Sequence, residues 1–269
     1  MNQSYRKRAP LDPQSLAREL EKRQSLWKNF DLEDELSSTN DFAKDLIKKE
    51  INEGHFVLTN FQSKGRGRQD RTWIAPKNSS LFISIILKSS TKDNLGWIPL
   101  MAGVALQKTL QTEMLVELKI KWPNDLVIVK NDEYFKCAGI LMEKVNDYVI
   151  AGIGINFDQT KDELPIKESS SIQQYLNSDL SKEELIALFV SEFAALWHEE
   201  SNAASWPTPS LVRQYKANCV TLGKEISALM PSGESIQGLA KDISVSGELV
   251  LDTLQGEVKL NSGQVHLKH

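Results

Sequence analysis

Two segments near the N-terminus carry apolar residues at helical spacing. Residues 12–28 and residues 39–53 each predict an amphipathic helix, because charged and polar residues separate the apolar positions of one face. These positions are Leu16, Leu20 and Trp27 in the first segment and Phe42, Leu46 and Ile47 in the second. Ser37 and Ser38 can cap the start of the second helix, and Gly54 is expected to end it.

The middle of the chain predicts strands on both sides of a buried helix. Residues 97–111 are apolar on most faces and predict that helix. Strands are predicted where β-branched and aromatic residues cluster, over 56–60, 81–87, 118–121, 126–129, 135–145 and 148–155. The polar stretch 158–171 predicts a mobile loop, and two further helices are expected at about 181–199 and 209–219.

After Gly223 the pattern changes to short alternating segments separated by glycine turns, which is typical of a small antiparallel barrel. Three parts are therefore expected. Residues 1–35 are expected to form an N-terminal extension with a helix, and residues 1–10 of it a frayed tail. Residues 36–220 are expected to form a catalytic domain, and residues 221–269 the small β-barrel. The predicted fold class is α+β, with a mixed sheet and helices on one face.

Composition excludes several classes of protein but does not identify the function. The 269 residues are 41% hydrophobic and 25% charged, with a net charge of -4, so the surface as a whole does not attract polyanions. Two widely separated cysteines and four histidines form no metal or redox spacing, which favours a reducing compartment. No apolar run approaches the roughly 20 residues of a membrane helix, and a cytoplasmic location is expected.

The long polar stretch 62–80 contains a cluster of positive charge. Residues 64–71 read Lys-Gly-Arg-Gly-Arg-Gln-Asp-Arg, four cations among eight residues. Glycine lets the backbone approach a ligand closely, and arginine presents paired donors to carboxylate and phosphate oxygens. Trp73 offers an apolar wall nearby. The stretch predicts an anion-binding loop, with a solvated basic loop or an RNA-binding patch as the alternatives.

Two further segments favour a ligand site. Residues 121–126 read Lys-Trp-Pro-Asn-Asp-Leu and place polar groups between two strands, in a conformation that the proline restricts. Lys136 lies in an apolar strand, where it must meet an anion or reach water at a sheet edge. Residues 152–156 place two glycines and Asn156 at a strand end, which suits close approach of a ligand.

Together these motifs resemble those of the biotin–protein ligase family. In family order they are Ser38-Thr39-Asn40, Gln62, Gly65-Arg66-Gly67-Arg68 with Arg71 and Trp73, Lys121 to Leu126, Lys136 to Leu141, and Gly152 to Asn156. The resemblance covers about residues 36–160 by motif and continues more loosely into the C-terminal part. It implies the sheet of the class II synthetases and biotin–lipoyl ligases, followed by an SH3-like β-barrel.

The resemblance also implies a two-step reaction. ATP and biotin give biotinyl-5′-adenylate and pyrophosphate, and a lysine of a biotin carboxyl carrier protein then attacks the adenylate, so the enzyme is a carbon–nitrogen bond-forming ligase. Arg68 and Lys136 are the implied catalytic residues, because like charges must be neutralised before carboxylate and α-phosphate can meet. The other implied biotin-binding residues are Ser38, Thr39, Asn40, Gln62, Gly65, Arg66, Gly139 and Gly152. The other implied ATP-binding residues are Arg71, Trp73, Lys121, Asn124, Asp125 and Asn156.

Cofactor and partner expectations follow from the same resemblance. ATP and Mg²⁺ act as co-substrate and ion, with Asp125 as a candidate Mg²⁺ ligand through water, and no tightly bound prosthetic group is expected. The loop 65–71 is expected to be mobile without ligand and to close over the adenylate. We expect a monomer or homodimer, with residues 148–155 or a neighbouring strand as a possible pairing edge. No membrane or nucleic-acid partner is expected, since about 35 residues precede Ser38, too few for the DNA-binding domain of some relatives.

Three alternatives stay open at this point. A lipoate– or octanoate–protein ligase shares the architecture and the acyl-adenylate chemistry. An RNA-binding module would need aromatic stacking platforms beside the basic loop, and aromatic residues make up only 7% of the chain. A non-catalytic binding protein would be expected to have lost charged motif residues.

Overall fold

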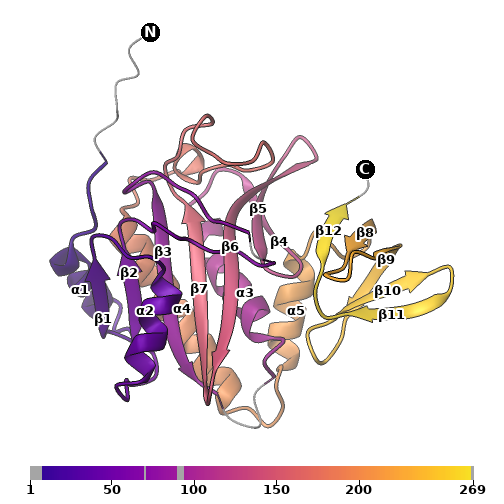
Figure 1. Ribbon diagram of the computed structural model, residues 1–269, viewed down its shortest axis with the longest axis horizontal. Helices are drawn as coiled ribbons and strands as arrows, with labels where there is room; N and C mark the ends of the chain where they lie inside the picture. The colour runs from indigo at the N-terminus through magenta and orange to yellow at the C-terminus, as the bar shows by residue number, and fades with distance from the viewer. Residues whose placement is uncertain (1–7, 70, 90–93, 268–269) are drawn as a thin grey trace.

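The computed structural model describes residues 8–69, 71–89 and 94–267. Its larger part is built on a seven-stranded sheet with the order β1-β2-β3-β7-β6-β5-β4 (Figure 1). The strands are β1 (Phe30–Glu33), β2 (Phe56–Thr59), β3 (Ser80–Lys88), β4 (Glu117–Lys121), β5 (Asp125–Lys130), β6 (Glu133–Val145) and β7 (Tyr148–Asn156). Only the β1–β2 pair is parallel in this sheet, which confirms the predicted mixed sheet.

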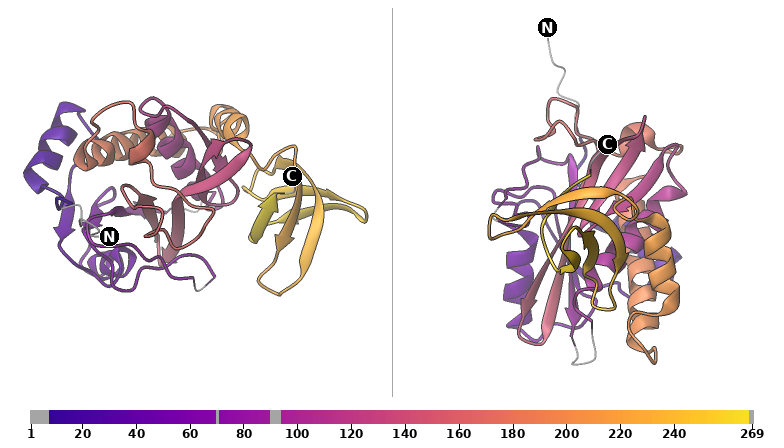
Figure 2. Two further views of the ribbon diagram at one scale, coloured as in Figure 1. Left: turned by 90° about the horizontal axis from the view of Figure 1, so that it is seen from above. Right: turned by 90° about the vertical axis from the view of Figure 1, so that its right-hand side faces the viewer.

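Most of the helices cover one face of this sheet. The helices α3 (Ile98–Gln111) and α4 (Lys182–Ser201) pack together there, with α1 (Pro13–Lys22) against α4 and α5 (Pro209–Asn218) against α3 (Figure 2). The helix α2 (Thr39–Ile47) packs on the opposite face, where its apolar residues meet Val57, Ile86 and Ile150. The prediction of helices on one face therefore holds for four helices but not for α2, which leaves the rest of that face open for a site.

The first two helices are shorter than predicted, and Gly54 does not have the predicted role of ending the second one. Trp27 lies beyond the end of α1 but is still buried, with its ring 5.7 Å from that of Phe193. A methyl group on Gly54 would lie 1.9 Å from Trp27 Cδ1, so this glycine makes room for the indole. The helix α2 already ends at Ile47, and Glu50 takes a left-handed φ of 56°. Gly54 is thus a packing position rather than the end of the helix.

The C-terminal part is a five-stranded antiparallel sheet beside the larger domain (Figures 1 and 2). Its strands are β8 (Glu225–Leu229), β9 (Ser235–Ile243), β10 (Leu249–Thr253), β11 (Gly256–Leu260) and β12 (Gln264–Leu267). The strand order β11-β10-β9-β8-β12 confirms the predicted antiparallel domain, although no pairing between described residues closes it into a barrel. Two indoles dock it, as Trp122 Nε1 donates to Gly247 O at 3.1 Å and Trp97 Nε1 to Ser244 O at 3.3 Å.

Two elements were not predicted from the sequence, namely β1 and a short 3-10 helix, η1 (Gln173–Tyr175).

The strand β7 lies in the middle of the sheet between β3 and β6, so it offers no edge for pairing with a second copy of the chain. Beyond Ile140, β6 pairs only with β7 among the described strands. No helix within the described ranges is long and apolar enough to cross a membrane.

Candidate active site

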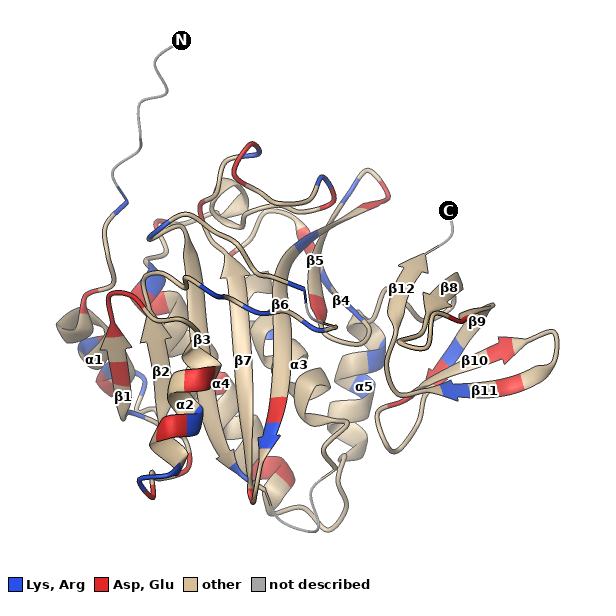
Figure 3. Ribbon diagram, viewed as in Figure 1, with Lys and Arg blue, Asp and Glu red and all other residues tan. Residues whose placement is uncertain are grey.

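A cavity of about 580 Å³ opens on the sheet face that carries α2. Its floor is formed by β3, β6 and β7, and its walls by the loop 62–74, the turn between β4 and β5, residues 165–169 and residues 263–266 of the C-terminal part. Cationic positions lie on the segments that cross in front of β6 and β7 (Figure 3). The volume is in the range typical of small-molecule sites.

Glycines make the floor of this cavity flat. Gly139 of β6 and Gly154 of β7 are register partners, and the Trp73 ring lies directly on them. A methyl group on Gly139 would lie 2.8 Å from Trp73 Cζ3, and one on Gly154 would lie 3.0 Å from the same ring. Gly152 is equally tight, since a methyl there would lie 2.3 Å from Asn40 Oδ1. The predicted close approach at Gly139 and Gly152 is therefore made by protein side chains.

The loop 62–74 is folded back on itself above this floor. Trp73 N donates to Gly65 O at 2.9 Å, and Gly67 N donates to Arg71 O at 2.7 Å. A methyl group on Gly65 would lie 2.4 Å from Trp73 O, so only glycine allows this pairing. The described residues on the two sides of position 70 are thus joined by backbone hydrogen bonds, and the predicted mobility of the loop without ligand stays a prediction.

One end of the cavity carries neutral hydrogen-bonding groups at the start of α2. Gln62 Oε1 accepts from Thr39 N at 2.8 Å and from Thr39 Oγ1 at 3.1 Å. Ser84 of β3 donates to Asn40 Oδ1 at 2.6 Å and lies 2.7 Å from Thr39 Oγ1. Ser38 lines the same end and is buried. This end suits a neutral polar ligand group, because none of these five residues carries an ionised side chain that the ligand would have to neutralise.

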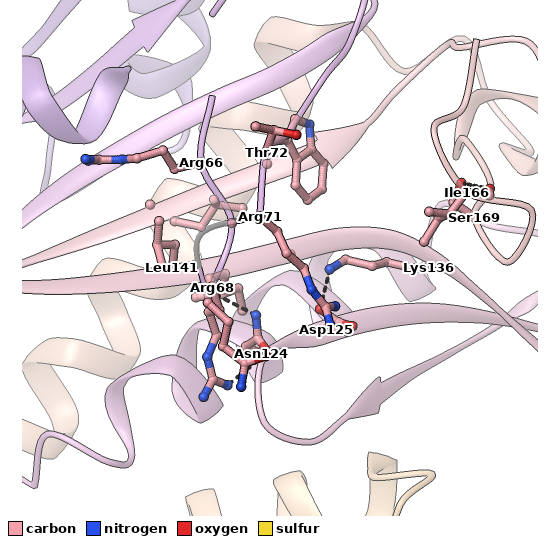
Figure 4. Close-up of a pocket in the computed structure, with 18 of the residues that line it drawn as sticks. Arg66, Arg68, Arg71, Thr72, Asn124, Asp125, Lys136, Leu141, Ile166 and Ser169 are labelled. Atoms are coloured by element: carbon pink, nitrogen blue, oxygen red, sulfur yellow. Dashed lines mark hydrogen bonds and ion pairs between the residues drawn. The ribbon is translucent and has the colours of Figure 1, made fainter. Parts of the chain in front are cut away.

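The opposite end gathers three cations, Arg68, Lys121 and Lys136, around Asp125. Figure 4 shows Lys136 paired with Asp125. Lys136 Nζ lies 2.6 Å from Asp125 Oδ1, and its ammonium lies 5.5 Å from the centre of the Trp73 ring. Arg68 and Lys121 also face Asp125: burial lowers the pKa of both side chains, and the Asp125 charge partly opposes that shift. One carboxylate cannot neutralise three cations, so this end attracts a further anion.

The strand that carries Lys136 is internal to the sheet, so the lysine meets an anion instead of reaching water at a sheet edge.

The two predicted asparagines are both bonded to protein groups, and Asn124 holds the turn between β4 and β5 in place. Its side chain accepts from Arg68 Nη1 at 3.1 Å and donates to Ile140 O at 2.9 Å. Asn156 is buried and bonded inside the protein, since its Oδ1 accepts from Gln159 Nε2 at 3.1 Å.

The two other arginines of the loop also line the cavity, but their partners are groups other than Asp125. Arg66 Nη2 pairs with Asp41 at 2.7 Å and with Glu143 at 3.0 Å, on the side of α2 (Figure 4). Arg71 donates to Gln264 of the C-terminal sheet. The three arginines of the folded-back loop therefore have different partners, because Arg68 bonds to Asn124 and shares none with Arg66 or Arg71.

The sequence reading missed several residues of this site. Glu143 of β6 accepts from Asn40 Nδ2 at 2.7 Å and from Lys44 Nζ at 2.7 Å, besides its pair with Arg66. The backbone of Lys136 is bonded to the loop after β7, donating to Glu168 O at 2.8 Å and accepting from Ser170 N at 3.0 Å. The alternation of β6 puts Glu143 on the same face as Gly139, and that pattern could have revealed it.

No group of three or more His, Cys, Asp or Glu among the described residues could hold a metal ion. Two acidic residues line the cavity, Asp125 and the exposed Glu168, and Asp125 is the one that pairs with Lys136. Cys137 is fully buried, and burial raises the pKa of its thiol, so it is not a nucleophile. The site therefore offers cations and hydrogen-bond donors rather than a nucleophile or a resident metal cluster.

Comparison with known proteins places this site in a family. Residues 33–158 match the model of the Biotin/lipoate A/B protein ligase family, and residues 221–268 match the Biotin protein ligase C terminal domain. The chain is 28% identical over 278 residues to the biotin–[acetyl-CoA-carboxylase] ligase of Mycobacterium tuberculosis, with all of both chains covered. It is 26% identical to the bifunctional ligase/repressor BirA of Escherichia coli, over 85% of this chain and 73% of that protein.

The solved structures agree with the sequence matches. The biotin protein ligase of Aquifex aeolicus in complex with biotin and ATP superposes with a TM-score of 0.73 at 25% identity, covering 90% of this chain and all of that one. The Leishmania major biotin protein ligase in complex with biotinyl-5-AMP shares the fold, with a TM-score of 0.58 at 19% identity. The two family matches together span well over half of the chain and include both ends of the cavity. The chain belongs to the biotin/lipoate A/B protein ligase family and, within it, to the biotin protein ligases.

Proposed function

We propose that this chain uses ATP to join biotin to a lysine of a biotin carboxyl carrier protein of a carboxylase. The observation that carries the proposal is the two-ended cavity, with neutral hydrogen-bonding groups at one end and three cations around Asp125 at the other. Biotin matches these two ends, since its neutral ureido ring and its carboxylate lie at opposite ends of the molecule. The relatives named above are biotin ligases, and the C-terminal match favours biotin over lipoate.

In the first step a biotin carboxylate oxygen attacks the α-phosphorus of ATP. The bond between the α-phosphorus and the bridging oxygen of the β-phosphate breaks, and pyrophosphate leaves with that electron pair. Attacker and target are both negatively charged, so the barrier falls when fixed cations lie between them. We assign this role to Arg68 and Lys136, and the assignment is supported by the position of both side chains beside Asp125 on the cavity wall.

The neutral end is proposed to hold the ureido ring. Gln62 Oε1 is bonded to Thr39, which fixes the amide and leaves its Nε2 as a donor toward a carbonyl oxygen. Ser38 and Asn40 border the same space. Gly65, Gly139 and Gly152 are proposed to allow close packing of the ring, whereas Arg66 contributes through its pairs with Asp41 and Glu143.

The nucleotide is proposed to lie toward the turn between β4 and β5. The proposed contacts are Arg71, Trp73, Lys121, Asn124, Asp125 and Asn156, all on the cavity wall. Mg²⁺ arrives with ATP and neutralises phosphate charge. A single carboxylate, that of Asp125, fits an ion held mainly by phosphate and water oxygens, which is the usual way in which Mg²⁺ binds at ATP sites.

In the second step the ε-amine of the carrier lysine attacks the carbonyl carbon of the mixed anhydride. The bond between this carbon and the phosphate oxygen breaks, AMP leaves, and an amide remains. Water would hydrolyse the anhydride, so closure of loop 65–71 over the adenylate is proposed to exclude it. Equal protease cleavage within this loop in the presence and absence of biotin and ATP would refute the closure.

The direct test is pyrophosphate release from ATP and Mg²⁺ with biotin, lipoate or octanoate added in turn. Release that depends on biotin alone supports the proposal, and transfer to a carrier domain then completes it. Release with lipoate or octanoate would keep the mechanism and change the substrate. No release with any acid would refute acid activation.

The RNA-binding alternative is less favoured by the site. A nucleic-acid patch needs cations that are free to meet phosphates, whereas Arg66 and Arg68 are engaged with protein groups inside or beside the cavity. We therefore propose no nucleic-acid partner, and a monomer or homodimer in solution. Sedimentation with and without biotin and ATP tests the assembly.

A further inference from the structure

Arg8 joins the N-terminal segment to the loop that follows β7. Its Nη1 and Nη2 donate to the two carboxylate oxygens of Glu163 at 3.1 and 2.7 Å, and its Nε pairs with Asp158 Oδ1. Nη2 also donates to Asp158 O at 2.9 Å. The Arg8 and Asp158 side chains are only 10% and 9% exposed, and that of Glu163 is 28% exposed. Such a paired, desolvated fork is stronger than a surface ion pair.

The backbone around Arg8 is fixed as well. Arg8 O accepts from Asn78 Nδ2 at 3.1 Å, and Lys182 of α4 donates to Ala9 O at 2.9 Å. Leu11 N donates to Asn60 Oδ1 at 2.9 Å. Residues 8–11 are therefore part of the folded domain, which corrects the expectation of a frayed tail over residues 1–10 for the part that the structure describes.

The loop held by Arg8 reaches the reacting end of the cavity. Residues 165, 166, 168 and 169 line the cavity, and the main chain of Glu168 and Ser170 brackets Lys136 through the two hydrogen bonds given above. At the start of the loop, Gln159 Nε2 donates to Asn156 Oδ1 at 3.1 Å and to Ser80 Oγ at 2.7 Å. The loop between Asp158 and Ser170 thus has one end at Arg8 and the other at Lys136.

The loop is held at three places. Near Lys136 it is held by main-chain hydrogen bonds, and at its start Asp158 N donates to Ser79 O at 2.9 Å while Gln159 O accepts from Ser171 Oγ at 2.8 Å. Between these places, the turn that ends at Glu163 is tied to the N-terminal segment by the pair of Arg8 with Glu163. The Glu163 carboxylate also accepts from Thr160 N at 2.9 Å, so Arg8 binds a turn that is already closed by this bond. Removing the Arg8 guanidinium would release the turn and leave two partly buried carboxylates without their cation.

We propose that Arg8 is a positioning residue for the adenylation step: it holds the loop 158–170 in the arrangement that fixes Lys136 beside Asp125. This inference rests on the proposed function for its kinetic part and on the contacts alone for its structural part. Arg8 touches neither end of the cavity directly. It acts through Asp158 and Glu163, on the nucleotide side of the site, and leaves the Gln62 end untouched.

The test compares Arg8→Met and Arg8→Lys with the wild-type chain and with Arg18→Met. Arg18 is an exposed arginine of α1 with no ion partner among the described residues, so its variant controls for loss of charge in the N-terminal segment. In Arg8→Met we expect kcat/KM for ATP to fall by about ten-fold or more, with KM for biotin within about two-fold of wild type. Arg8→Lys keeps the positive charge but loses the paired guanidinium donors, so its kcat/KM for ATP should lie between those of wild type and Arg8→Met.

Amide hydrogen exchange provides a readout that does not depend on activity. The peptide spanning 158–170 and the amide of Lys136 should exchange faster in Arg8→Met and at wild-type rates in Arg18→Met. Three results would each overturn the proposal. They are unchanged exchange of the loop in Arg8→Met, a loss of binding for biotin as large as that for ATP, or effects of Arg18→Met equal to those of Arg8→Met. If the wild-type chain itself releases no biotin-dependent pyrophosphate, the proposed function fails, and the exchange experiment alone decides whether Arg8 holds the loop.

Discussion

Replacing Lys136 by methionine tests whether the cationic end of the cavity is catalytic. The substitution keeps most of the unbranched side chain and removes the ammonium that lies 2.6 Å from Asp125 Oδ1. Arg68 and Lys121 remain near Asp125, so the carboxylate keeps partners and the fold should lose less than about 1 kcal/mol. Any large loss of activity then reflects the reaction rather than unfolding.

The size of the expected fall in adenylation rate can be estimated from the geometry of Lys136. Two unit charges about 4 Å apart interact by about 4 kcal/mol at an effective dielectric constant of about 20. Removal of one preorganised donor from a site of developing charge typically costs about 10²–10³ in kcat. The Lys136 side chain is 28% exposed and shares its charge with Asp125, which favours the lower figure. We therefore expect the rate of adenylation in Lys136→Met to fall by about 10².

Single-turnover pyrophosphate release measures the chemical step, and calorimetry measures ATP binding separately. Lys130→Met is the matched control, since Lys130 is exposed at the end of β5 and lies outside the cavity. The reasoning is refuted if adenylation in Lys136→Met stays within about two-fold of wild type. It is also refuted if ATP affinity falls while the rate at saturating ATP is unchanged, because Lys136 would then bind the ground state and the transition state equally.

Two further predictions concern packing and acid stability. In Gly139→Ala the new methyl group would lie 2.8 Å from Trp73 Cζ3, so the indole must move and biotin-dependent pyrophosphate release should fall by about ten-fold. Gly103→Ala, whose methyl group would meet nothing nearer than 3.4 Å, should leave release within about two-fold, and equal effects of the two substitutions would contradict the packing argument. The hydrogen bonds from Arg8 lower the pKa of Glu163 to about 2, below the ordinary value of about 4.3, so their stabilisation is complete above about pH 4.3 and is lost as the pH falls toward 2. Urea unfolding should show the stability difference between wild type and Arg8→Met shrinking by about 1 kcal/mol from pH 6 to pH 3, after discounting for partial exposure, and an unchanged difference would exclude this ion pair as its source.

The sequence predicted those parts of the fold that rest on local patterns. The strands β3 to β7 and the helices α3, α4 and α5 lie where periodicity placed them, with ends shifted by one or two residues in most cases. The β1 strand was missed because Phe30–Glu33 is short and half-polar, and its parallel partner β2 is more than twenty residues away along the chain. The length of the first helix was overestimated because Trp27 fits the helical spacing but is buried by the loop at Gly54.

The site was predictable as a set of residues but not as an arrangement. The residues implied as catalytic or binding all line the cavity except Gly65, which lies in its loop, while their roles stay predictions. Their partners were not predictable, because Arg66 and Glu143 or Arg71 and Gln264 are joined only by the way the loop folds back. Sequence spacing fixes which residues share a strand face, whereas a loop with two glycines leaves the direction of each arginine open.

The charges at the reacting end explain why this arrangement suits an acid-activating enzyme. Arg68, Lys121 and Lys136 carry three positive charges around the single negative charge of Asp125, which leaves a surplus of two. The proposed first step must bring together a carboxylate and an α-phosphate that each carry one negative charge, so the surplus matches the charge that the substrates bring. Asp125 keeps the cations close together while the substrates are absent, because three like charges on one cavity wall would otherwise repel each other. A site of this kind is preorganised by its own counterion, and the substrates need only to draw Lys136 away from Asp125 rather than assemble the cations.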